Sequence, residues 1–328
     1  MSLRILIGSC LAAGVLTACN RQAPADDHMA HMAPGDVSQP AVTPSTSQGD
    51  MSLPPSAAHS AARLANSPRH GEWVKVAWEP GSKDSLMAWI VYPSTNNAKS
   101  PVVVIVHEIY GLSTWIRGVA DQAASEGFIA IAPDLTSRLR GGPSMDSLTT
   151  DSAGKLTRML SSTERNRGIA AAARFAMAQP AAAPRYGVIG FCWGGQTTWM
   201  HAISQGIPGY SGGVAFYGLP YMNGAVPNAD SLAKVNKPIM MFNGAKDTRT
   251  GAPMPAVDSA MKADKKWYYS MNYPGAIHGF LRAQDDPRPT RNGETEDVVK
   301  AEEQANLAAT KDAWPRTVKF LKENLGIK

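Results

Sequence analysis

Cysteine, charge and long hydrophobic runs are all scarce in this chain of 328 residues. The three cysteines are Cys10, Cys19 and Cys192, too few for a fold stapled by several disulfides. Charged residues make up 18% of the chain, and the formal net charge of +5 is scattered without a basic stripe. We therefore expect no nucleic-acid partner. No internal repeat is visible, which favours one folded domain over a repeat array.

The apolar run near the N-terminus spans residues 5–15, which is shorter than the roughly 20 residues of a transmembrane helix. Arg4 precedes this run, and Leu16-Thr17-Ala18-Cys19 follows it in the manner of a bacterial lipoprotein processing site. We predict that residues 1–18 are a lipoprotein signal peptide and that Cys19 carries the lipid. Asn20 then favours the outer membrane of the cell envelope, facing the periplasm. The alternative is an ordinary secretory signal with an incidental cysteine.

Residues 19–70 are rich in alanine, proline, serine, histidine and methionine and have no sustained apolar period. This composition is typical of a disordered tether. The imidazoles and thioethers of His28-Met29-Ala30-His31-Met32 are ligand types that bind copper, although a flexible linker is the simpler interpretation. We place the folded domain at residues 71–328 and expect it to need no cofactor or metal.

Two types of strand pattern occur within this domain. Residues 73–78 and 86–92 alternate between apolar and polar side chains, which predicts an antiparallel hairpin. Continuous apolar runs, typical of parallel strands covered on both faces, occupy residues 102–106, 128–132, 188–191, 214–217 and 239–242. Helices are expected at residues 115–125, 164–178, 193–204 and 305–325. The prediction is an α/β fold with a mostly parallel central sheet and helices on both faces.

The sequence Gly190-Phe191-Cys192-Trp193-Gly194-Gly195 follows the predicted strand at 188–191. A G-x-nucleophile-x-G pattern forms a sharp turn from strand to helix, because only glycine lets the two elements approach so closely. The amides at the start of the following helix favour a thiolate and a developing oxyanion. Cys10 leaves with the signal and Cys19 is lipidated, so Cys192 remains as the one thiol. The alternative is a turn that happens to contain a small buried cysteine.

Two downstream residues supply partners for a cysteine nucleophile. Asp247 follows the predicted strand at 239–242, and His278 follows a further predicted strand at 267–273. The order nucleophile, acid, histidine is the order of α/β-hydrolases, in which each residue follows a strand of one parallel sheet. Singly, Asp247 is more often a loop or cap residue and His278 a solvated histidine. Together with the Cys192 turn they indicate a Cys-His-Asp triad.

From about Trp73 to the C-terminus the chain resembles the dienelactone hydrolase family, which has the α/β-hydrolase fold. A second matching block is His107-Glu108-Ile109-Tyr110-Gly111-Leu112. The resemblance implies that Glu108 faces the nucleophilic cysteine and keeps it protonated until substrate binds. It also implies that the backbone amides of Ile109 and Trp193 form the oxyanion hole.

The same resemblance extends to two arginines. Arg138 lies in the block Ala132-Pro133-Asp134-Leu135-Thr136-Ser137-Arg138, and Arg282 lies four residues after His278. The family binds its substrate carboxylate with arginines at these offsets, so the resemblance implies that role for both. Arg249 in the acid loop and the longer segment 282–302 depart from the family pattern, which leaves the substrate open.

The resemblance implies a carboxylic ester hydrolase that cleaves an ester or lactone, with an anionic substrate favoured by paired guanidinium groups. The reaction would pass through a thioester intermediate. One alternative is a broader envelope carboxylesterase or thioesterase. Another is an inactive hydrolase fold that serves as a binding or copper-handling module. We expect a monomer or a weak oligomer.

Overall fold

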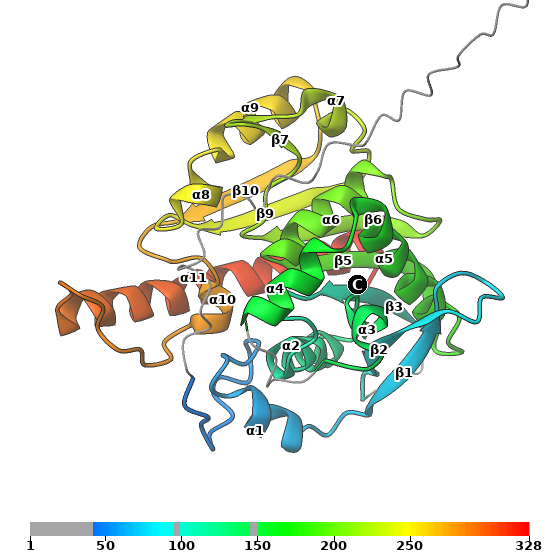
Figure 1. The fold of residues 1–328 in the computed structure, drawn as a ribbon, viewed down its shortest axis with the longest axis horizontal. Coiled ribbons are helices and arrows are strands. Elements are labelled where there is room, and N and C mark those ends of the chain that lie inside the picture. The colour runs from blue at the N-terminus through cyan, green and yellow to red at the C-terminus, as the bar shows by residue number, and fades with distance from the viewer. Residues whose placement is uncertain (1–41, 95–98, 145–149, 328) are drawn as a thin grey trace, which may run out of the picture.

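The computed structural model describes residues 42–94, 99–144 and 150–327. The predicted signal peptide, Cys19 and the His28 to Met32 segment lie outside the described residues. The centre of the molecule is an eight-stranded sheet with the order β1-β2-β4-β3-β5-β6-β9-β10 (Figure 1). The α/β architecture predicted from the sequence is therefore confirmed.

The strands of the central sheet divide into a hairpin and a parallel set. β1 (Gly71–Ala77) pairs antiparallel with β2 (Ser85–Val91), and β2 pairs antiparallel with β4 (Ile129–Asp134). The remaining neighbours are all parallel, and they involve β3 (Ser100–Val106), β5 (Ala182–Phe191), β6 (Tyr210–Phe216), β9 (Ile239–Gly244) and β10 (Tyr268–Tyr273). A small separate ribbon joins β7 (Met222–Asn223) to β8 (Val226–Pro227). The predicted hairpin and parallel strands are both confirmed.

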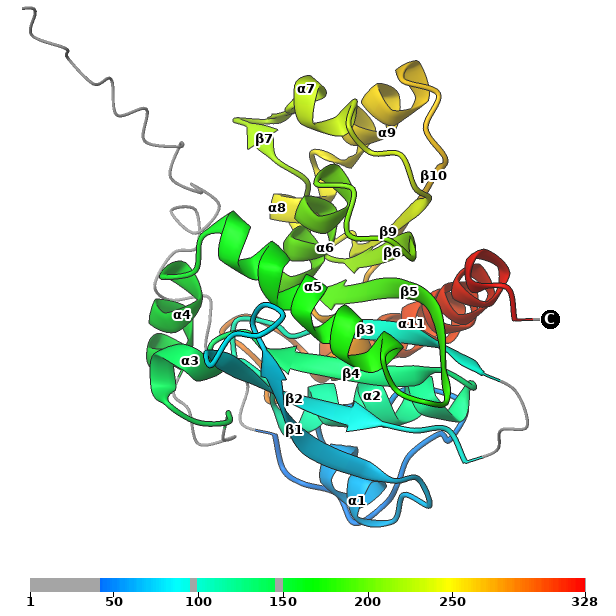
Figure 2. The same ribbon diagram turned by 90° about the vertical axis from the view of Figure 1, so that its right-hand side faces the viewer.

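Helices cover both faces of this sheet (Figure 2). One face packs against α2 (Thr114–Ser125) and α11 (Glu296–Leu325), and the other against α5 (Ser162–Met177), α6 (Trp193–Ile203) and α9 (Met254–Ala263). Shorter helices occupy the connections: α1 (Ser60–Ala65), α3 (Ser137–Arg140), α4 (Thr150–Arg158), α7 (Ala229–Leu232), α8 (Thr248–Gly251) and α10 (Phe280–Ala283). Among the described residues, none of the helices combines the length with the apolar character that a bilayer crossing requires.

Strand β3 explains why the central strands have continuous apolar sequences. All seven of its residues are buried. Val102, Val104 and Val106 belong to the cluster under α5 and α6, whereas Val103 and Ile105 belong to the cluster under α2 and α11. A strand covered on both faces gains about 1.5–3 kcal/mol from each large apolar side chain that it buries. The carboxyl end of β3 is thereby held rigidly in the middle of the sheet.

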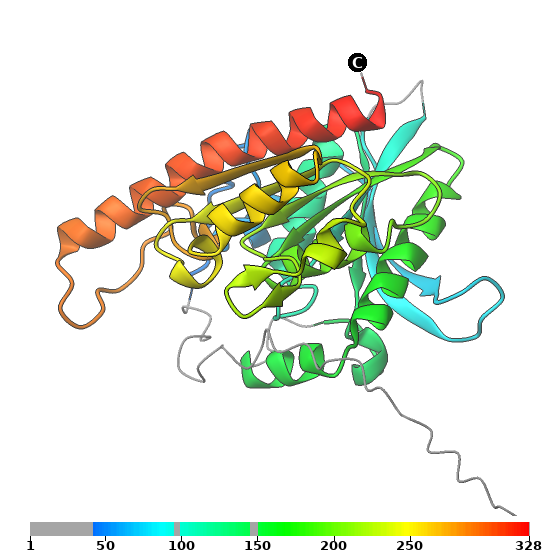
Figure 3. The ribbon, with the colours of Figure 1, turned by 90° about the horizontal axis from the view of Figure 1, so that it is seen from above.

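Helix α11 begins earlier than the sequence pattern predicts. It spans Glu296–Leu325 rather than 305–325 and runs along the sheet as the longest helix (Figure 3). Its first turn is stabilised by the Thr295 side chain, which accepts a hydrogen bond from the Val298 N–H, and by the acidic residues Glu296 and Asp297. Capping therefore places the start of α11 at Glu296, in a stretch where the apolar side chains do not yet repeat with a helical period.

The expected disordered tether to residue 70 is wrong for its C-terminal part. Residues 48–66, called here the N-terminal strap, pack on the outside of α2. The Arg63 guanidinium is buried and donates to the Gln122 side chain and to the carbonyls of residues 48, 50 and 53. Trp115 Nε1 donates to the Pro55 carbonyl at 3.0 Å. Polar contacts to one buried arginine anchor this segment, which explains why its sequence lacks an apolar period.

The segment between Arg282 and Glu302 is pinned by a network of charges. Arg288 contacts Glu302 through Nε at 2.7 Å and Glu294 through Nη1 at 2.7 Å. Lys246 Nζ lies 2.9 Å from the other Glu302 carboxylate oxygen. Glu302 is buried and its pKa is lowered because hydrogen bonds from Lys246 and Arg288 outweigh the cost of burial. Since Lys246 precedes Asp247, this network ties the long segment to the acid loop.

Candidate active site

The carboxyl edge of the parallel strands collects the polar residues predicted from the sequence. Glu108 follows β3, Cys192 follows β5, Asp247 follows β9 and His278 follows β10. In open α/β sheets this edge is where ligands bind. Interactions link His278 to Cys192, Asp247 and Glu108, so the fold brings these four residues together.

Cys192 occupies a strained turn between β5 and α6. Its φ of 56° and ψ of −116° are unusual for a residue with a side chain, and such backbone costs about 1–3 kcal/mol. Glycine is required on both sides. A Cβ on Gly190 would lie 2.0 Å from the Gly194 carbonyl oxygen, and a Cβ on Gly194 would lie 2.3 Å from the Val106 carbonyl oxygen. The turn therefore packs directly against the end of β3.

The imidazole of His278 is held by the carboxylate of Asp247. His278 Nδ1 lies 2.5 Å from Asp247 Oδ2. The Thr250 hydroxyl donates to the same oxygen at 2.5 Å, and the Thr250 N–H donates to Oδ1 at 3.4 Å. Burial opposes ionisation of Asp247, but the hydrogen bond and charge of His278 outweigh it and lower the carboxyl pKa. Asp247 is thus an ionised acceptor that fixes the proton of His278 on Nδ1.

The second ring nitrogen of His278 faces the nucleophile side. Nε2 is buried and has no hydrogen-bond partner of normal geometry among the described residues, although Cys192 lies close enough to interact with the ring. Burial alone would lower the pKa of His278, but Cys192 and Asp247 outweigh burial and raise it to about 10. The Tyr217 ring packs on the imidazole with a centroid separation of 4.9 Å. Nε2 is therefore the nitrogen free to exchange a proton with the thiol.

Glu108 is a buried carboxyl group beside this pair. Burial raises its pKa, and the charges of Arg282 and His278 oppose that rise. Arg282 Nε lies 3.6 Å from Glu108 Oε2, longer than a hydrogen bond. The Arg282 guanidinium also lies over the Tyr110 ring at 5.7 Å. Glu108 and Arg282, to which the resemblance assigns separate roles, therefore lie next to each other.

The two predicted oxyanion donors are the N–H groups of Ile109 and Trp193. Both residues are buried, and each is the first residue after a chemically important side chain, Glu108 or Cys192. Within the described part of the chain, neither N–H has a hydrogen-bond acceptor. Unpaired buried N–H groups are rare because they cost free energy. Two of them near the nucleophile are suited to stabilise a developing negative charge.

Arg138 is not brought to the nucleophile by its described contacts. Its Nη2 lies 2.6 Å from Asp84 Oδ2, and its guanidinium lies 4.6 Å from the centroid of the Trp78 ring. Both partners belong to the β1–β2 hairpin, at the side of the sheet. The role of Arg138 in carboxylate binding stays a prediction.

Arg249 directly contacts the pair formed by His278 and Asp247, called here the dyad. Its Nη2 lies 3.2 Å from His278 Nδ1 and 3.7 Å from Asp247 Oδ2, and about a third of its side chain is exposed. Because Nδ1 already donates its proton to Asp247, this contact is electrostatic rather than a second hydrogen bond. Arg249 thus adds a cation that the sequence prediction recorded only as a departure from the family pattern.

Three further residues at the site were missed by sequence reasoning. Thr250 supports Asp247, and its position three residues after an aspartate is a capping pattern that could have been recognised. Tyr217 has a φ of 41° and sits against His278, but no local motif predicts that contact. His107 hydrogen-bonds the Glu108 carbonyl through Nδ1 at 2.6 Å. Its place next to Glu108 in the matching block was the available signal.

Among residues 42–94, 99–144 and 150–327, no group of three or more His, Cys, Asp or Glu side chains could hold a metal ion.

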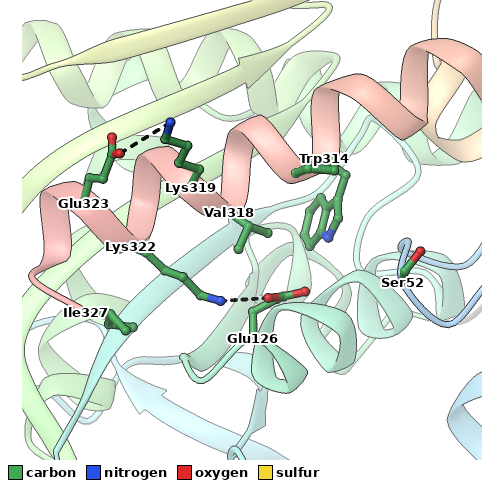
Figure 4. Close-up of a pocket in the computed structure, with 9 residues that line it drawn as sticks. Ser52, Glu126, Trp314, Val318, Lys319, Lys322, Glu323 and Ile327 are labelled. Atoms are coloured by element: carbon green, nitrogen blue, oxygen red, sulfur yellow. Dashed lines mark hydrogen bonds and ion pairs between the residues drawn. The ribbon is translucent and has the colours of Figure 1, made fainter.

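An open groove lies away from this site, between α11 and the end of α2 (Figure 4). Trp314, Val318 and Ile327 line it, and Lys322 Nζ contacts Glu126 at 2.9 Å. Glu126 precedes β4, so this groove is at the amino edge of the sheet, away from the polar cluster.

Comparison with known proteins agrees with this geometry. A family model described as "Dienelactone hydrolase family" matches residues 86–325. A "Putative carboxymethylenebutenolidase" from Salmonella typhimurium is 27% identical over 76% of this chain and 87% of its own length. A protein of the same description from Synechocystis is 29% identical over 69% of this chain and 87% of its own length.

Solved structures extend the likeness to the fold. A "Putative Dienelactone Hydrolase" from Klebsiella pneumoniae has 26% identity and a TM-score of 0.53, covering 74% of this chain and 99% of its own. An acylaminoacyl peptidase from Pyrococcus horikoshii shares the fold alone, with 15% identity and a TM-score of 0.56 over 81% of this chain and 43% of its own. The predicted α/β-hydrolase fold is confirmed. The chain belongs to the dienelactone hydrolase family and is a carboxylic ester hydrolase.

Proposed function

We propose that the protein hydrolyses esters or lactones through a thioester on Cys192, with His278 as general base and Asp247 as the acid that orients it. The observation that carries this proposal is the 2.5 Å contact between His278 Nδ1 and Asp247 Oδ2 beside the strained Cys192 turn. A base oriented by a third group next to a nucleophile is the arrangement that activates a thiol.

The acylation step follows from these positions. The raised pKa of His278 favours transfer of the thiol proton to Nε2, and the resulting thiolate attacks the substrate carbonyl to give a tetrahedral oxyanion. The N–H groups of Ile109 and Trp193 stabilise that charge, a contribution of about 3 kcal/mol for each donor. His278 then returns the proton to the leaving alkoxide, and the C–O bond breaks to leave the thioester. Water activated by the same histidine hydrolyses the thioester and restores Cys192.

Glu108 keeps the resting thiol protonated in this proposal. Its burial and raised pKa support a carboxyl group that can share a proton with Cys192. Arg282, 3.6 Å away, favours ionised Glu108. A substrate carboxylate that engages Arg282 would change this balance, because a guanidinium shared between two carboxylates attracts each less strongly.

The preferred substrate in this proposal is an anionic ester or lactone. Arg282 carries positive charge beside Glu108 and Arg249 carries it beside His278 and Asp247, and Arg249 is partly exposed to an entering ligand. A guanidinium binds a carboxylate through a matching pair of hydrogen bonds. A Bradyrhizobium relative, 29% identical over 64% of this chain and 83% of its own length, is described as "Probable 2-oxo-3-(5-oxofuran-2-ylidene)propanoate lactonase", the name of an anionic lactone hydrolase.

The test compares a dienelactone with p-nitrophenyl acetate, using the wild type and Cys192→Ala. The proposal expects a higher kcat/KM for the lactone and loss of both activities in the variant. Comparable values for the two substrates would support the broader carboxylesterase instead of the anionic specificity. Lactone hydrolysis that survives in Cys192→Ala would remove Cys192 as the nucleophile.

We propose in addition that lipid on Cys19 anchors the enzyme to the bacterial outer membrane. The apolar run at residues 5–15 and the Leu16 to Cys19 sequence support this location. Expression of Cys19→Ser beside the wild type tests it: the wild type should fractionate with outer membranes and the variant should not. Equal membrane content in both would exclude Cys19 as the anchor.

A further inference from the structure

His107 is a completely buried histidine that follows β3 directly. Its Nε2 accepts a hydrogen bond from the Leu135 N–H at 3.2 Å. A backbone amide can only donate, so Nε2 carries no proton. The proton of the neutral ring is therefore on Nδ1, which donates to the Glu108 carbonyl at 2.6 Å. Burial lowers the pKa of His107, which supports this neutral tautomer.

The Glu108 carbonyl shares a peptide plane with the Ile109 N–H. In a trans peptide these two groups point in opposite directions, and the described chain has no cis peptide bonds. The Gly111 N–H also donates to the Glu108 carbonyl, at 3.3 Å. Turning the Ile109 N–H away from the site would require the whole plane to rotate, which would break both of these hydrogen bonds. The His107 contact is the shorter of the two.

His107 also contacts the other half of the predicted oxyanion hole. Its ring stacks on the Trp193 side chain with a centroid separation of 5.4 Å and an interplanar angle of 13°. The guanidinium of Arg165 also lies over the Trp193 ring, with its Cζ 5.0 Å from the ring centroid. One buried side chain thus touches the peptide that carries one donor and the side chain of the residue that carries the other.

We propose that His107 is a positioning residue that keeps the oxyanion hole formed before substrate arrives, by holding the Glu108–Ile109 peptide through Nδ1. This inference rests on the acyl-transfer chemistry proposed above. Preformed donors lower the barrier because they need no reorganisation when charge develops on the substrate oxygen. His107 itself touches neither the thiol nor the dyad in the described contacts.

Two substitutions, each of which can replace only one of the ring nitrogens, separate the two hydrogen bonds. In His107→Asn the amide nitrogen can take the place of Nδ1 and keep the bond to the Glu108 carbonyl. In His107→Gln the amide oxygen can take the place of Nε2 and keep the bond from Leu135. We expect kcat for p-nitrophenyl acetate to fall roughly 10- to 100-fold in His107→Gln, less than the roughly 100- to 1000-fold loss on removal of an oxyanion donor, because the Ile109 N–H is loosened and not removed. The fall should be several-fold smaller in His107→Asn, and KM should change little in either variant.

Alkylation of Cys192 by iodoacetamide provides the second measurement, followed on the Cys192 peptide of the full chain by mass spectrometry. Displacement of iodide at a saturated carbon forms no oxyanion. Both variants should therefore be alkylated at a rate within about twofold of the wild-type rate, a change far smaller than the fall in kcat that loss of an oxyanion donor causes. Parallel loss of alkylation and hydrolysis would overturn the inference, as would equal kcat in the two variants. A wild type that hydrolyses no ester would remove the proposed function and this inference together.

Discussion

Replacing Asp247 by Asn tests how the dyad is built. The change keeps the shape of the side chain but removes the charge that holds His278 Nδ1 at 2.5 Å. The Thr250 hydroxyl can still donate to the amide oxygen, so the acid loop should keep its conformation. A hydrogen bond between charged partners contributes about 1.5–3 kcal/mol. We expect kcat to fall about 10- to 100-fold if this bond orients the imidazole in the transition state.

The same variant has a predicted effect on stability with a defined pH window. In the wild type the pKa of His278 is raised from its ordinary 6.5 to about 10. The stabilisation from protonated His278 is therefore complete below pH 6.5 and is lost as pH rises toward 10. Asp247→Asn lowers the pKa of His278. The difference in unfolding free energy between wild type and variant should be largest near pH 6 and shrink toward pH 10, as measured by urea denaturation.

Asp258→Asn is a matched control, because Asp258 accepts a hydrogen bond from the Ser270 hydroxyl at 2.8 Å on the neighbouring helix α9. It removes the same charge without touching His278, so its kcat should stay close to that of the wild type. The reasoning is refuted if Asp247→Asn retains wild-type kcat, or if both variants lose the same activity.

Three other features are probed by substitution, one of them with a surface control. Glu108→Gln should change kcat more than KM, since Glu108 acts on activation of the thiol; steady-state kinetics with unchanged kcat would contradict this. Arg63→Ala should lower the unfolding free energy by roughly 2–4 kcal/mol by leaving buried carbonyls unpaired, whereas Arg316→Ala on the surface should cost under about 0.5 kcal/mol. His201 is buried and its pKa is lowered to about 3. The stability that the neutral His201 side chain contributes to the folded state is therefore lost as pH falls below 6.5. The unfolding free energy of His201→Gln should fall less steeply with decreasing pH than that of the wild type. An equally steep fall in the variant would exclude His201 as the source of the acid sensitivity.

The sequence predicted the parts of the fold and the site that depend on local patterns. The turn around Cys192 has a sequence pattern because sterics demand glycine at Gly190 and Gly194. The order of Cys192, Asp247 and His278 predicted their meeting, because residues that follow parallel strands share one edge of the sheet. These predictions needed no knowledge of side-chain direction.

The features that the sequence could not predict depend on long-range polar contacts. The sequence of the N-terminal strap predicts disorder, because its anchor is a single buried Arg63 that meets Gln122 on α2 and leaves no local pattern. Arg138 has the sequence offset of a carboxylate-binding arginine, yet Asp84 from the hairpin turn pairs with it. An offset along the chain places a Cα atom, whereas the direction of a long side chain depends on the partners that the fold supplies.

The central claim is that Cys192 carries the acyl group during turnover. The most direct measurement is intact and peptide mass spectrometry of the full chain, quenched in acid milliseconds after mixing with p-nitrophenyl acetate. The account predicts an acetyl group on the Cys192 peptide in the wild type, formed as fast as nitrophenol appears, and none in Cys192→Ala. Acetylation of another residue that keeps pace with turnover, or turnover by Cys192→Ala, would contradict it.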